Sequence, residues 1–271
     1  MMDVHVSYDG DLNGAEDFSY ERPKRRFGWG KRRPSLEAVL DEQRGLPRYS
    51  LLLGMCTDRL PLVLDLTDAS GGAYLIAGDN GFDNTTLVHS ILSAACLANS
   101  PADLSVHLIS PHADDLLQFH RQPHFKISFE PYRPEIAVVL DEMVNLVQSR
   151  MRSGAVTPVH LFAIDGLDLL WQALTPPSRA QLDWLIEYGP EVGVMVFASI
   201  ESTYISRAIS PTIDLFNSRI LGPVSQPNLA RYLSGLGRSY LADLEPGEQY
   251  LVRTHGNSFT IWMLQSENIP I

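Results

Sequence analysis

Apolar residues from Ser35 onward follow two alternating patterns. Short runs in which almost every residue is apolar have the length of strands, and segments with apolar residues three or four positions apart have the period of helices. The runs cover residues 74–77, 104–109, 159–164 and 192–198. A run that is apolar throughout is typical of a strand buried on both faces. The pattern therefore predicts an α/β fold in which helices flank a mainly parallel sheet.

Two segments between these runs have the clearest helical spacing. The first covers residues 86–98 and the second residues 134–151. The apolar face of the first carries Leu87, Ile91, Leu92, Ala95 and Cys96, and that of the second carries Val138, Val139, Met143, Leu146 and Val147. We expect both faces to pack against the sheet.

The ends of this region differ from its middle. Residues 249–253 and 259–264 have strand composition and are joined by residues 255–257, His-Gly-Asn, which predicts a C-terminal antiparallel hairpin. At the other end, Ser35 can cap a short helix. We expect a single folded domain over residues 35–271.

The first 34 residues show no sustained apolar periodicity and are rich in Gly, Pro, Asp and Arg, which predicts a disordered tail. The chain has 21 basic and 32 acidic residues and a net charge of −11, yet seven basic residues cluster in this tail. Such a cluster can bind nucleic acid, an acidic partner or a membrane surface, or it can serve as a solvated linker. The seven are Arg22, Lys24, Arg25, Arg26, Lys31, Arg32 and Arg33.

Composition excludes several classes of protein. No apolar run is long enough to span a bilayer, and the first ten residues, with Asp3 and Asp9, do not have the pattern of a secretory signal. We therefore expect a cytoplasmic protein. Cys56 and Cys96 form no metal-binding pattern, which predicts buried free thiols. His120 and His124 have no cysteine or carboxylate at ligand spacing, so we interpret them as solvated or hydrogen-bonded rather than metal-binding.

A loop after the run at residues 74–77 has the layout of a phosphate-binding loop. A strand is followed by a glycine-containing segment and then by a helix that opens with threonine. Gly78 and Thr85 match the positions that the full motif requires, but Asp83 replaces its second glycine and Asn84 its lysine. Taken alone, the same residues also fit an ordinary strand-to-helix turn with a threonine cap.

Further segments, read in order, strengthen the first interpretation. The segments are YLIAGDNGFDNTT at 74–86, VHLISPHADDLLQFHRQPHF at 106–125, DEMVNLVQSRM at 141–151, VHLFAIDGLDLL at 159–170 and GVMVFASIES at 193–202. Together with LPLVLDL at 60–66 and the segment that begins at Ser218, they resemble the motor domain of the FtsK/SpoIIIE DNA translocases, in the HerA/FtsK superfamily of P-loop ATPases. The resemblance covers about residues 50 to 264.

The resemblance implies a RecA-like P-loop fold and a site for ATP and Mg²⁺. It places nucleotide-binding residues at Gly78, Asp79, Asn80, Gly81, Asn84, Thr85 and Thr86. Thr85 and Asp165 match the positions that hold Mg²⁺ in the family. It also implies that the strands ending at Ala77 and Ile164 are neighbours and that Thr85 and Asp165 converge at their carboxyl ends.

The departures from the family lie where its chemistry occurs. Asn84 supplies no positive charge, Gly166 stands in place of the catalytic glutamate, and Ile200 stands in place of the glutamine that senses the γ-phosphate. A carboxylate at Asp83, about 4 Å from a phosphate, would cost on the order of 4 kcal/mol at an effective dielectric constant near 20. We interpret Asp168 as a first-turn helix acid and Glu201 as a surface acid at a strand end. No catalytic residue is assigned.

Two functions remain open. The first is a pseudo-ATPase subunit or scaffold that assembles with itself or with an active FtsK-like motor, with DNA as a further partner. The alternative is an ATP-binding DNA translocase with a non-standard phosphate loop. Asn84 and Gly166 favour the first function, and Thr85 and Asp165 keep the second open. The family's membrane spans and winged-helix DNA-reading domain are not recognised in the sequence.

Overall fold

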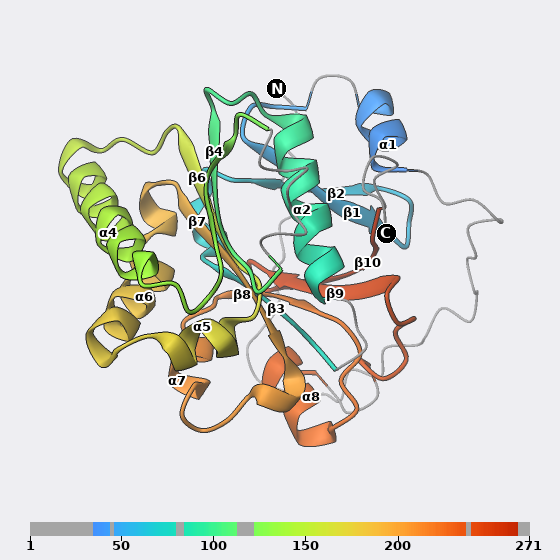
Figure 1. The fold of residues 1–271 in the computed structure, drawn as a ribbon. Coiled ribbons are helices and arrows are strands. Elements are labelled where there is room, and N and C mark those ends of the chain that lie inside the picture. Colours follow the sequence, from blue (N-terminus) through green and yellow to red (C-terminus); the bar gives the residue numbers. More distant parts are fainter. Residues whose placement is uncertain (1–34, 44–45, 80–83, 113–121, 237–239, 265–271) are drawn as a thin grey trace, which may run out of the picture. The chain divides into compact units, whose positions relative to one another are not determined.

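One ten-stranded sheet organises the protein in the computed structural model, which describes residues 35–43, 46–79, 84–112, 122–236 and 240–264 (Figure 1). The strand order is β2-β1-β10-β9-β8-β3-β7-β6-β4-β5. The predicted tail, residues 1–34, lies outside the described residues, so both its disorder and its partners stay predictions.

Six adjacent strands of the ten are parallel. In sheet order they are β8 (Ser218–Leu221), β3 (Tyr74–Gly78), β7 (Val194–Glu201), β6 (Val159–Ile164), β4 (Leu104–Ile109) and β5 (Phe125–Phe129). The other four run antiparallel to their neighbours and are β9 (Gln249–Thr254), β10 (Asn257–Trp262), β1 (Ser50–Cys56) and β2 (Pro61–Asp65). The prediction of a mainly parallel sheet with a C-terminal antiparallel hairpin is confirmed.

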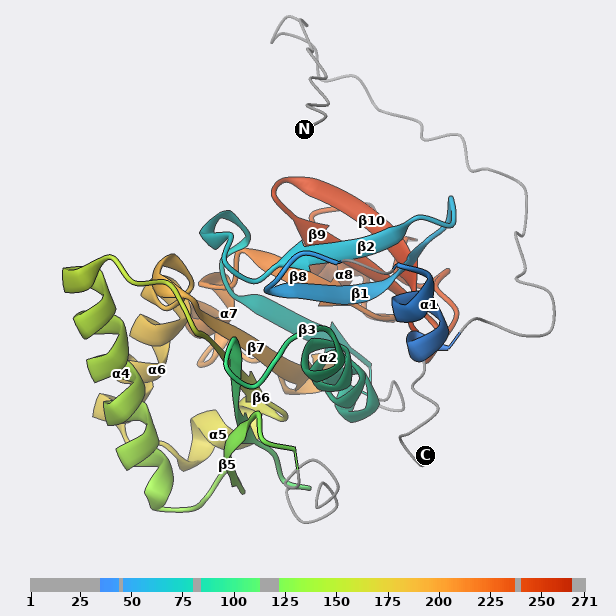
Figure 2. The same ribbon diagram turned by 90° about the horizontal axis from the view of Figure 1, so that it is seen from above.

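Helices cover both faces of the sheet. They are α1 (Leu36–Glu42), α2 (Asn84–Ala98), α4 (Glu135–Ser153), α5 (Leu167–Ala173), α6 (Pro176–Tyr188), α7 (Ser210–Asp214) and α8 (Pro227–Ser234), with short 3₁₀ turns η1 (Ala69–Gly71), η3 (Pro190–Val192) and η4 (Ser202–Tyr204). The chain passes from β3 to β4 in one direction across the sheet and returns through β6, β7 and β8 in the other. Right-handed crossovers therefore place α2 on one face and α4 and α6 on the other, as Figure 2 shows.

One prediction about the strand order is wrong. The strands that end near Ala77 and at Ile164 are not neighbours, because β7 lies between them and pairs with both. The carboxyl ends of β3, β7, β6 and β4 nevertheless meet at one edge of the sheet, where α/β proteins form their ligand crevices. Thr85 and Asp165 therefore still converge at this edge, as the sequence predicts, although the strand order differs from the prediction.

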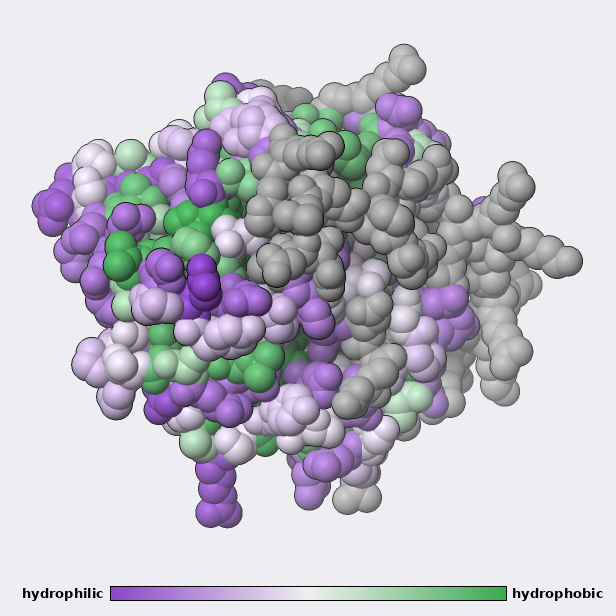
Figure 3. All heavy atoms as spheres, in the orientation of Figure 1, coloured by the Kyte–Doolittle hydropathy of each residue, from purple (hydrophilic) through white to green (hydrophobic). Residues whose placement is uncertain are grey.

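The core lies between the parallel strands and the helices. Every apolar residue predicted for the face of α2 is buried. In α4 the buried stripe includes Val139, Met143 and Val147, whereas Val138 is 58% exposed and Leu146 only partly buried. The stripe follows the 3.6-residue period, and Val138 lies beside it. Figure 3 shows exposed apolar residues scattered among hydrophilic ones on the face that carries α4 and α5.

Several smaller predictions can be checked in the same way. Ser35 caps α1, because its hydroxyl accepts a hydrogen bond from the Ala38 amide. Cys96 is buried as expected, but Cys56 is only partly buried, at the end of β1. No helix among the described residues is long and apolar enough to cross a membrane.

Candidate functional site

A buried carboxylate lies at the carboxyl edge of the parallel strands. Asp165 directly follows β6 and is 3% exposed. Its Oδ2 accepts hydrogen bonds from the hydroxyls of Ser110 and Thr85, both at 3.0 Å, and its Oδ1 accepts from Ser199 at 2.9 Å and from Thr85 at 3.2 Å. Three hydroxyl donors therefore surround one negative charge that water scarcely reaches.

The strand ends explain why these hydroxyls meet. Ser110 directly follows β4 and Ser199 lies near the end of β7, and both strands are neighbours of β6. Thr85 is the second residue of α2, which follows β3, the strand on the far side of β7. The serine hydroxyls also accept hydrogen bonds, Ser199 from the Gly166 amide at 3.0 Å and Ser110 from the His112 amide at 3.1 Å. These bonds fix the loops after β4 and β6 to the carboxylate.

A cavity of about 720 Å³ opens beside this carboxylate. Its described lining contains three acidic residues, Asp165, Asp168 and Glu201, and neither lysine nor arginine. Apolar walls come from Ile200, which is buried, and from Leu169 and Tyr204, which are 44% and 52% exposed; Asn84, Thr85, Pro111, His112, Gly166, Gln172 and Ser199 complete the lining.

Asn84 lies at the position of the lysine in the phosphate-loop motif and is 8% exposed. Its Nδ2 donates to the carbonyl oxygen of Ile200 at 3.3 Å. Its Oδ1 has no hydrogen-bond partner among the described residues. The side chain at this position is thus neutral, and it leaves an acceptor buried beside the cavity.

Gly166 has a conformational reason to be glycine. It precedes α5 with φ of +86°, in the left-handed region that strains other residues. A Cβ there would come within 3.2 Å of Leu169 Cδ1. A glutamate at this position would therefore require a different local backbone as well as a different side chain.

The two other acids behave differently from each other. Asp168 occupies the first turn of α5, as the sequence predicts; burial raises its pKa, an effect that its own amide and that of Leu169 oppose by hydrogen bonding. Glu201 ends β7, but the prediction that it is a surface acid is wrong. It is only partly exposed, and its Oε2 is buried without a partner among the described residues.

The predicted phosphate-binding residues are only partly within the described chain. Gly78 ends β3, and Thr86 lies in the first turn of α2. Asp79 is bound to protein: its Oδ2 accepts from the Ser225 amide at 2.7 Å and its Oδ1 from the Ser202 hydroxyl. Burial acts to raise the pKa of Asp79, but these hydrogen bonds outweigh it and lower the pKa. Asn80, Gly81 and Asp83 lie outside the described residues.

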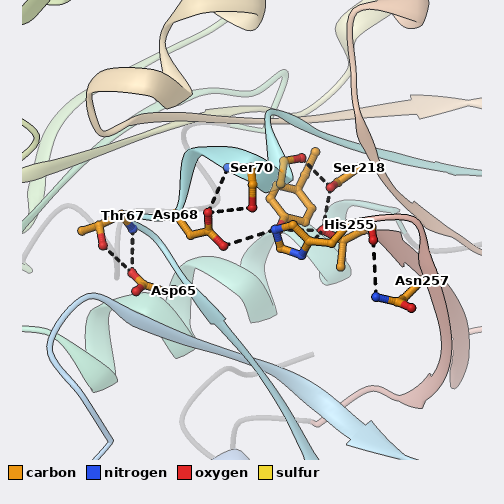
Figure 4. A network of polar contacts seen from close by, with 10 residues as sticks. Asp65, Thr67, Asp68, Ser70, Ser218, His255 and Asn257 are labelled. Atoms are coloured by element: carbon orange, nitrogen blue, oxygen red, sulfur yellow. Dashed lines mark hydrogen bonds and ion pairs between the residues drawn. The ribbon is translucent and has the colours of Figure 1, made fainter. Parts of the chain in front are cut away.

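A second polar network lies at the opposite edge of the sheet, where β3 and β8 begin (Figure 4). Asp68 Oδ2 lies 3.3 Å from His255 Nε2, and His255 Nδ1 lies 3.3 Å from Thr254 Oγ1. The Ser218 hydroxyl donates to the Thr254 oxygen at 2.8 Å. His255 and Gly256 form the two-residue turn between β9 and β10 with positive φ, so the network fastens this hairpin to η1.

The sequence singles out Thr85 and Asp165 as Mg²⁺ positions and interprets His120 and His124 as histidines that bind no metal. No set of three or more histidine, cysteine or acidic side chains in the described part of the chain is arranged to hold a metal ion. His124 is buried with Nε2 at 2.9 Å from the Asn99 carbonyl oxygen, as predicted, and His120 lies outside the described residues. Thr85 and Asp165 have the donor types that Mg²⁺ prefers, but here they are bonded to each other.

No family model and no curated protein matches the chain. Solved structures do. The cytoplasmic domain of the type VII secretion ATPase EccC of Thermomonospora curvata aligns over 84% of this chain and 30% of its own, at 17% identity and a TM-score of 0.64. EssC (ATPases 2 and 3) of Geobacillus thermodenitrificans aligns over 82% of this chain and 46% of its own, at 16% identity and a TM-score of 0.65.

A third structure is the pCW3 conjugation coupling protein TcpA, solved as a monomer with ATPgS. It aligns over 84% of this chain and 69% of its own, at 12% identity and a TM-score of 0.64. This chain has the fold of an FtsK-like P-loop ATPase domain. It spans less than half the length of the EccC and EssC structures.

The P-loop ATPase fold places Asp165 and Thr85 together, as the sequence predicts, whereas Ser199 was not singled out. Its position at the end of a predicted strand was the available signal.

Proposed function

We propose that this chain is a pseudo-ATPase: a subunit or scaffold that keeps the P-loop ATPase fold without hydrolysing ATP. One observation carries the proposal. The cavity at the expected nucleotide site is lined by Asp165, Asp168 and Glu201, and no lysine or arginine lines it among the described residues. A triphosphate would bring further negative charge to an anionic cavity.

The electrostatic cost can be bounded. Two like charges about 4 Å apart repel by roughly 4 kcal/mol at an effective dielectric constant of 20, and the missing lysine attraction is of similar size. Since about 1.4 kcal/mol corresponds to a factor of ten, nucleotide affinity would fall by several powers of ten. By resemblance, the position of Gly166 holds the carboxylate that acts on water, and the position of Ile200 holds the amide that senses the γ-phosphate. In this chain neither position has such a side chain.

Direct measurement tests this proposal. The purified full chain should bind neither ATP nor ATP with Mg²⁺ at millimolar concentration in calorimetry, and it should show no phosphate release above background, with or without duplex DNA. The double variant Asp83→Gly/Asn84→Lys should gain nucleotide binding, because it restores the cation and a glycine. The matched variant Asp83→Gly/Asn84→Gln, which lacks the cation, should not. Hydrolysis by the unmodified protein would overturn the proposal.

A second candidate is an ATP-binding DNA translocase with an altered loop. Thr85 and Asp165 favour it, because they match the positions that, by resemblance, hold Mg²⁺, and they lie within hydrogen-bonding distance of each other. The TcpA structure with ATPgS shows that a protein of this fold binds an ATP analogue. In this case ATP would bind the unmodified protein, and Asp165→Asn would abolish turnover.

The partners belong to the same proposal. A subunit of this kind would assemble with itself or with an active motor in the cytoplasm, and the EccC, EssC and TcpA structures suggest motors of secretion or conjugation. Residues 22–33 would add contact with DNA phosphates. That contact should weaken steeply with salt, and a chain beginning at Ser35 should lose it. If the shortened chain binds DNA with the same affinity as the full chain, residues 22–33 do not contact DNA and serve only as a linker.

A further inference from the structure

Helix α8 is short and depends on groups outside it for its position. It has eight residues, and its N-cap residue, Gln226, makes no side-chain hydrogen bond to the first turn. Of its own residues, Ala230, Leu233 and Ser234 are buried. Helices shorter than about 12 residues are marginal on their own. The contacts at the two ends of α8 therefore decide how firmly it is held against the sheet.

The C-terminal end of α8 is attached to the sheet by two arginines. Arg219 of β8 donates through Nη1 to the carbonyl oxygens of Tyr232 and Leu233, both at 2.9 Å. Arg253 of β9 donates through Nη1 to the carbonyl oxygen of Ser234. Cations stabilise this end of a helix, where the last carbonyl oxygens have no partner within the helix. The last turn of α8 is thus fixed to two neighbouring strands.

The N-terminal end is attached through one carboxylate, that of Asp79. Ser225, which precedes the N-cap residue, donates its amide to Asp79 Oδ2 at 2.7 Å, and Asp79 donates its own amide to the carbonyl oxygen of Pro223 at 2.9 Å. The other carboxylate oxygen accepts from the hydroxyl of Ser202, the first residue of η4, which is 2% exposed. Asp79 therefore joins the segments that follow β3, β7 and β8.

These contacts engage the groups with which Asp79 could bind a ligand. The resemblance assigns Asp79 to nucleotide binding, yet both of its carboxylate oxygens and its amide are bonded within the chain. A nucleotide that used them would have to break the contacts that hold the start of α8. The arginines at the other end lie on paired strands and would be unaffected.

We propose that Asp79 acts as a conformational link between the end of β3 and α8, rather than as a nucleotide ligand. While Asp79 keeps its contacts, the first turn of α8 is held in place. When they break, this turn separates from the strand ends, and the arginines keep the last turn on the sheet. Because such coupling is reciprocal, a backbone change at Asp79 and a partner bound at α8 affect each other. The inference goes beyond the proposed function and does not depend on it, since none of these contacts involves a nucleotide.

Hydrogen–deuterium exchange of the full chain, resolved by residue, tests the link. Asp79→Ala should speed exchange of the Ser225 and Ala230 amides about tenfold or more, because it removes hydrogen bonds to a charged group. Exchange in β4 and β6 should not change. Asp65→Ala is the matched control, because the Asp65 carboxylate accepts from the amide and hydroxyl of Thr67 within its own turn. It should leave exchange in α8 unchanged.

A further variant tests whether Asp79 transmits the effect. Ser202→Ala should speed exchange at Ser225 in the same direction but by less, because it removes one of the donors that hold Asp79. In the Asp79→Ala background the same substitution should add nothing, since the link is already broken.

Three results would overturn the inference. The first is unchanged exchange at Ser225 and Ala230 in Asp79→Ala. The second is an equal increase in α8, β4 and β6, which would mean that Asp79 supports only the stability of the whole fold. The third is an effect of Ser202→Ala that has the same size with and without Asp79. If Asp79→Ala does not fold, Asp79→Asn, which removes the charge and keeps an acceptor, is compared with Asp65→Asn by the same criteria.

Discussion

The two edges of the parallel sheet carry polar networks built from the same chemical groups but used in different ways. At the carboxyl edge, hydroxyls from three elements surround Asp165 beside a cavity. At the amino edge, Asp68 and His255 join Thr254 and Ser218, and the network connects a turn to a hairpin. The side chains of Asp68 and His255 are 46% and 36% exposed, whereas Asp165 is almost wholly buried.

The difference shows that a carboxylate surrounded by hydroxyls does not by itself identify a functional site. What distinguishes the Asp165 edge is the space beside it and the acceptors left unsatisfied there. The Asp68 network encloses no comparable set among the described residues, and its hydrogen bonds explain its position without a ligand. The two networks should therefore differ in how much the free energy of unfolding falls when their carboxylates are removed.

The largest effect is expected for Asp165→Ala. Removal of the carboxylate leaves the hydroxyls of Thr85, Ser110 and Ser199 buried without their acceptor, which should lower the free energy of unfolding by about 4 kcal/mol. Guanidinium denaturation measures this loss. Asp41→Ala, at an exposed position of α1, serves as the control and should change stability little. Equal stability of the two variants would mean that Asp165 is not part of the folded framework.

Acid should produce the next largest effect, through a third polar site. His107 and His160 lie side by side on β4 and β6 with Nε2 and Nδ1 3.1 Å apart. Burial is the main cause that lowers the pKa of each to about 4, and Lys126 also lowers both, while Arg150 acts on His160. Since the unfolded imidazoles titrate near 6.5, the unfolded state binds more protons between pH 6.5 and 4.

Stability should therefore be fully present above pH 6.5 and fall as the pH decreases toward 4. Partial exposure of His160 reduces the expected loss for the pair to about 2 kcal/mol. Urea midpoints at pH 7, 5.5 and 4.5 measure it. In His160→Gln the urea midpoint should fall less steeply with decreasing pH than in the unmodified chain. Parallel curves for the two proteins would contradict the assignment.

The smallest effect is expected at the amino edge. Hydrogen bonds from the Ser70 hydroxyl and amide lower the pKa of Asp68, and His255 adds to the shift. The stabilisation is thus present above the ordinary pKa of 3.8 and is lost as the pH falls through the lower folded value. Because the pair is exposed, Asp68→Asn should cost less than about 1 kcal/mol at pH 6. The difference from the unmodified chain should shrink as the pH falls below 3.8. If Asp68→Asn lowered the free energy of unfolding as much as Asp165→Ala does, the two edges would not differ in the way described above.

Sequence reasoning predicted those parts of the fold that local patterns determine. The strands β4 and β6 have the predicted bounds, because each mainly apolar run ends at a polar residue, Ser110 after β4 and Asp165 after β6. Strands β1, β5 and β8 were not predicted. The strand order was also partly wrong, because β7 enters between β3 and β6 through contacts between residues distant in sequence. No local pattern encodes which strand will lie between two others.

The candidate site was predicted as a pair and found as a cluster. Thr85 and Asp165 were matched through the resemblance, and their contact is confirmed. Neither Ser110 nor Ser199 was assigned to the site from the sequence. Their roles depend on strand order and on side-chain direction at the sheet edge. The partial burial of Glu201 likewise depends on the cavity wall and could not be derived from its place at the end of an apolar run.

The hydroxyl cluster around Asp165 also has a consequence for how such chains evolve. Substitution of this aspartate would leave buried donors unsatisfied, so selection for a stable fold alone would keep it in place. A motif aspartate can then persist in a lineage after turnover has ceased. Among proteins of this fold, the charge of the residue at the Asn84 position would separate working motors from silent ones better than the aspartate does.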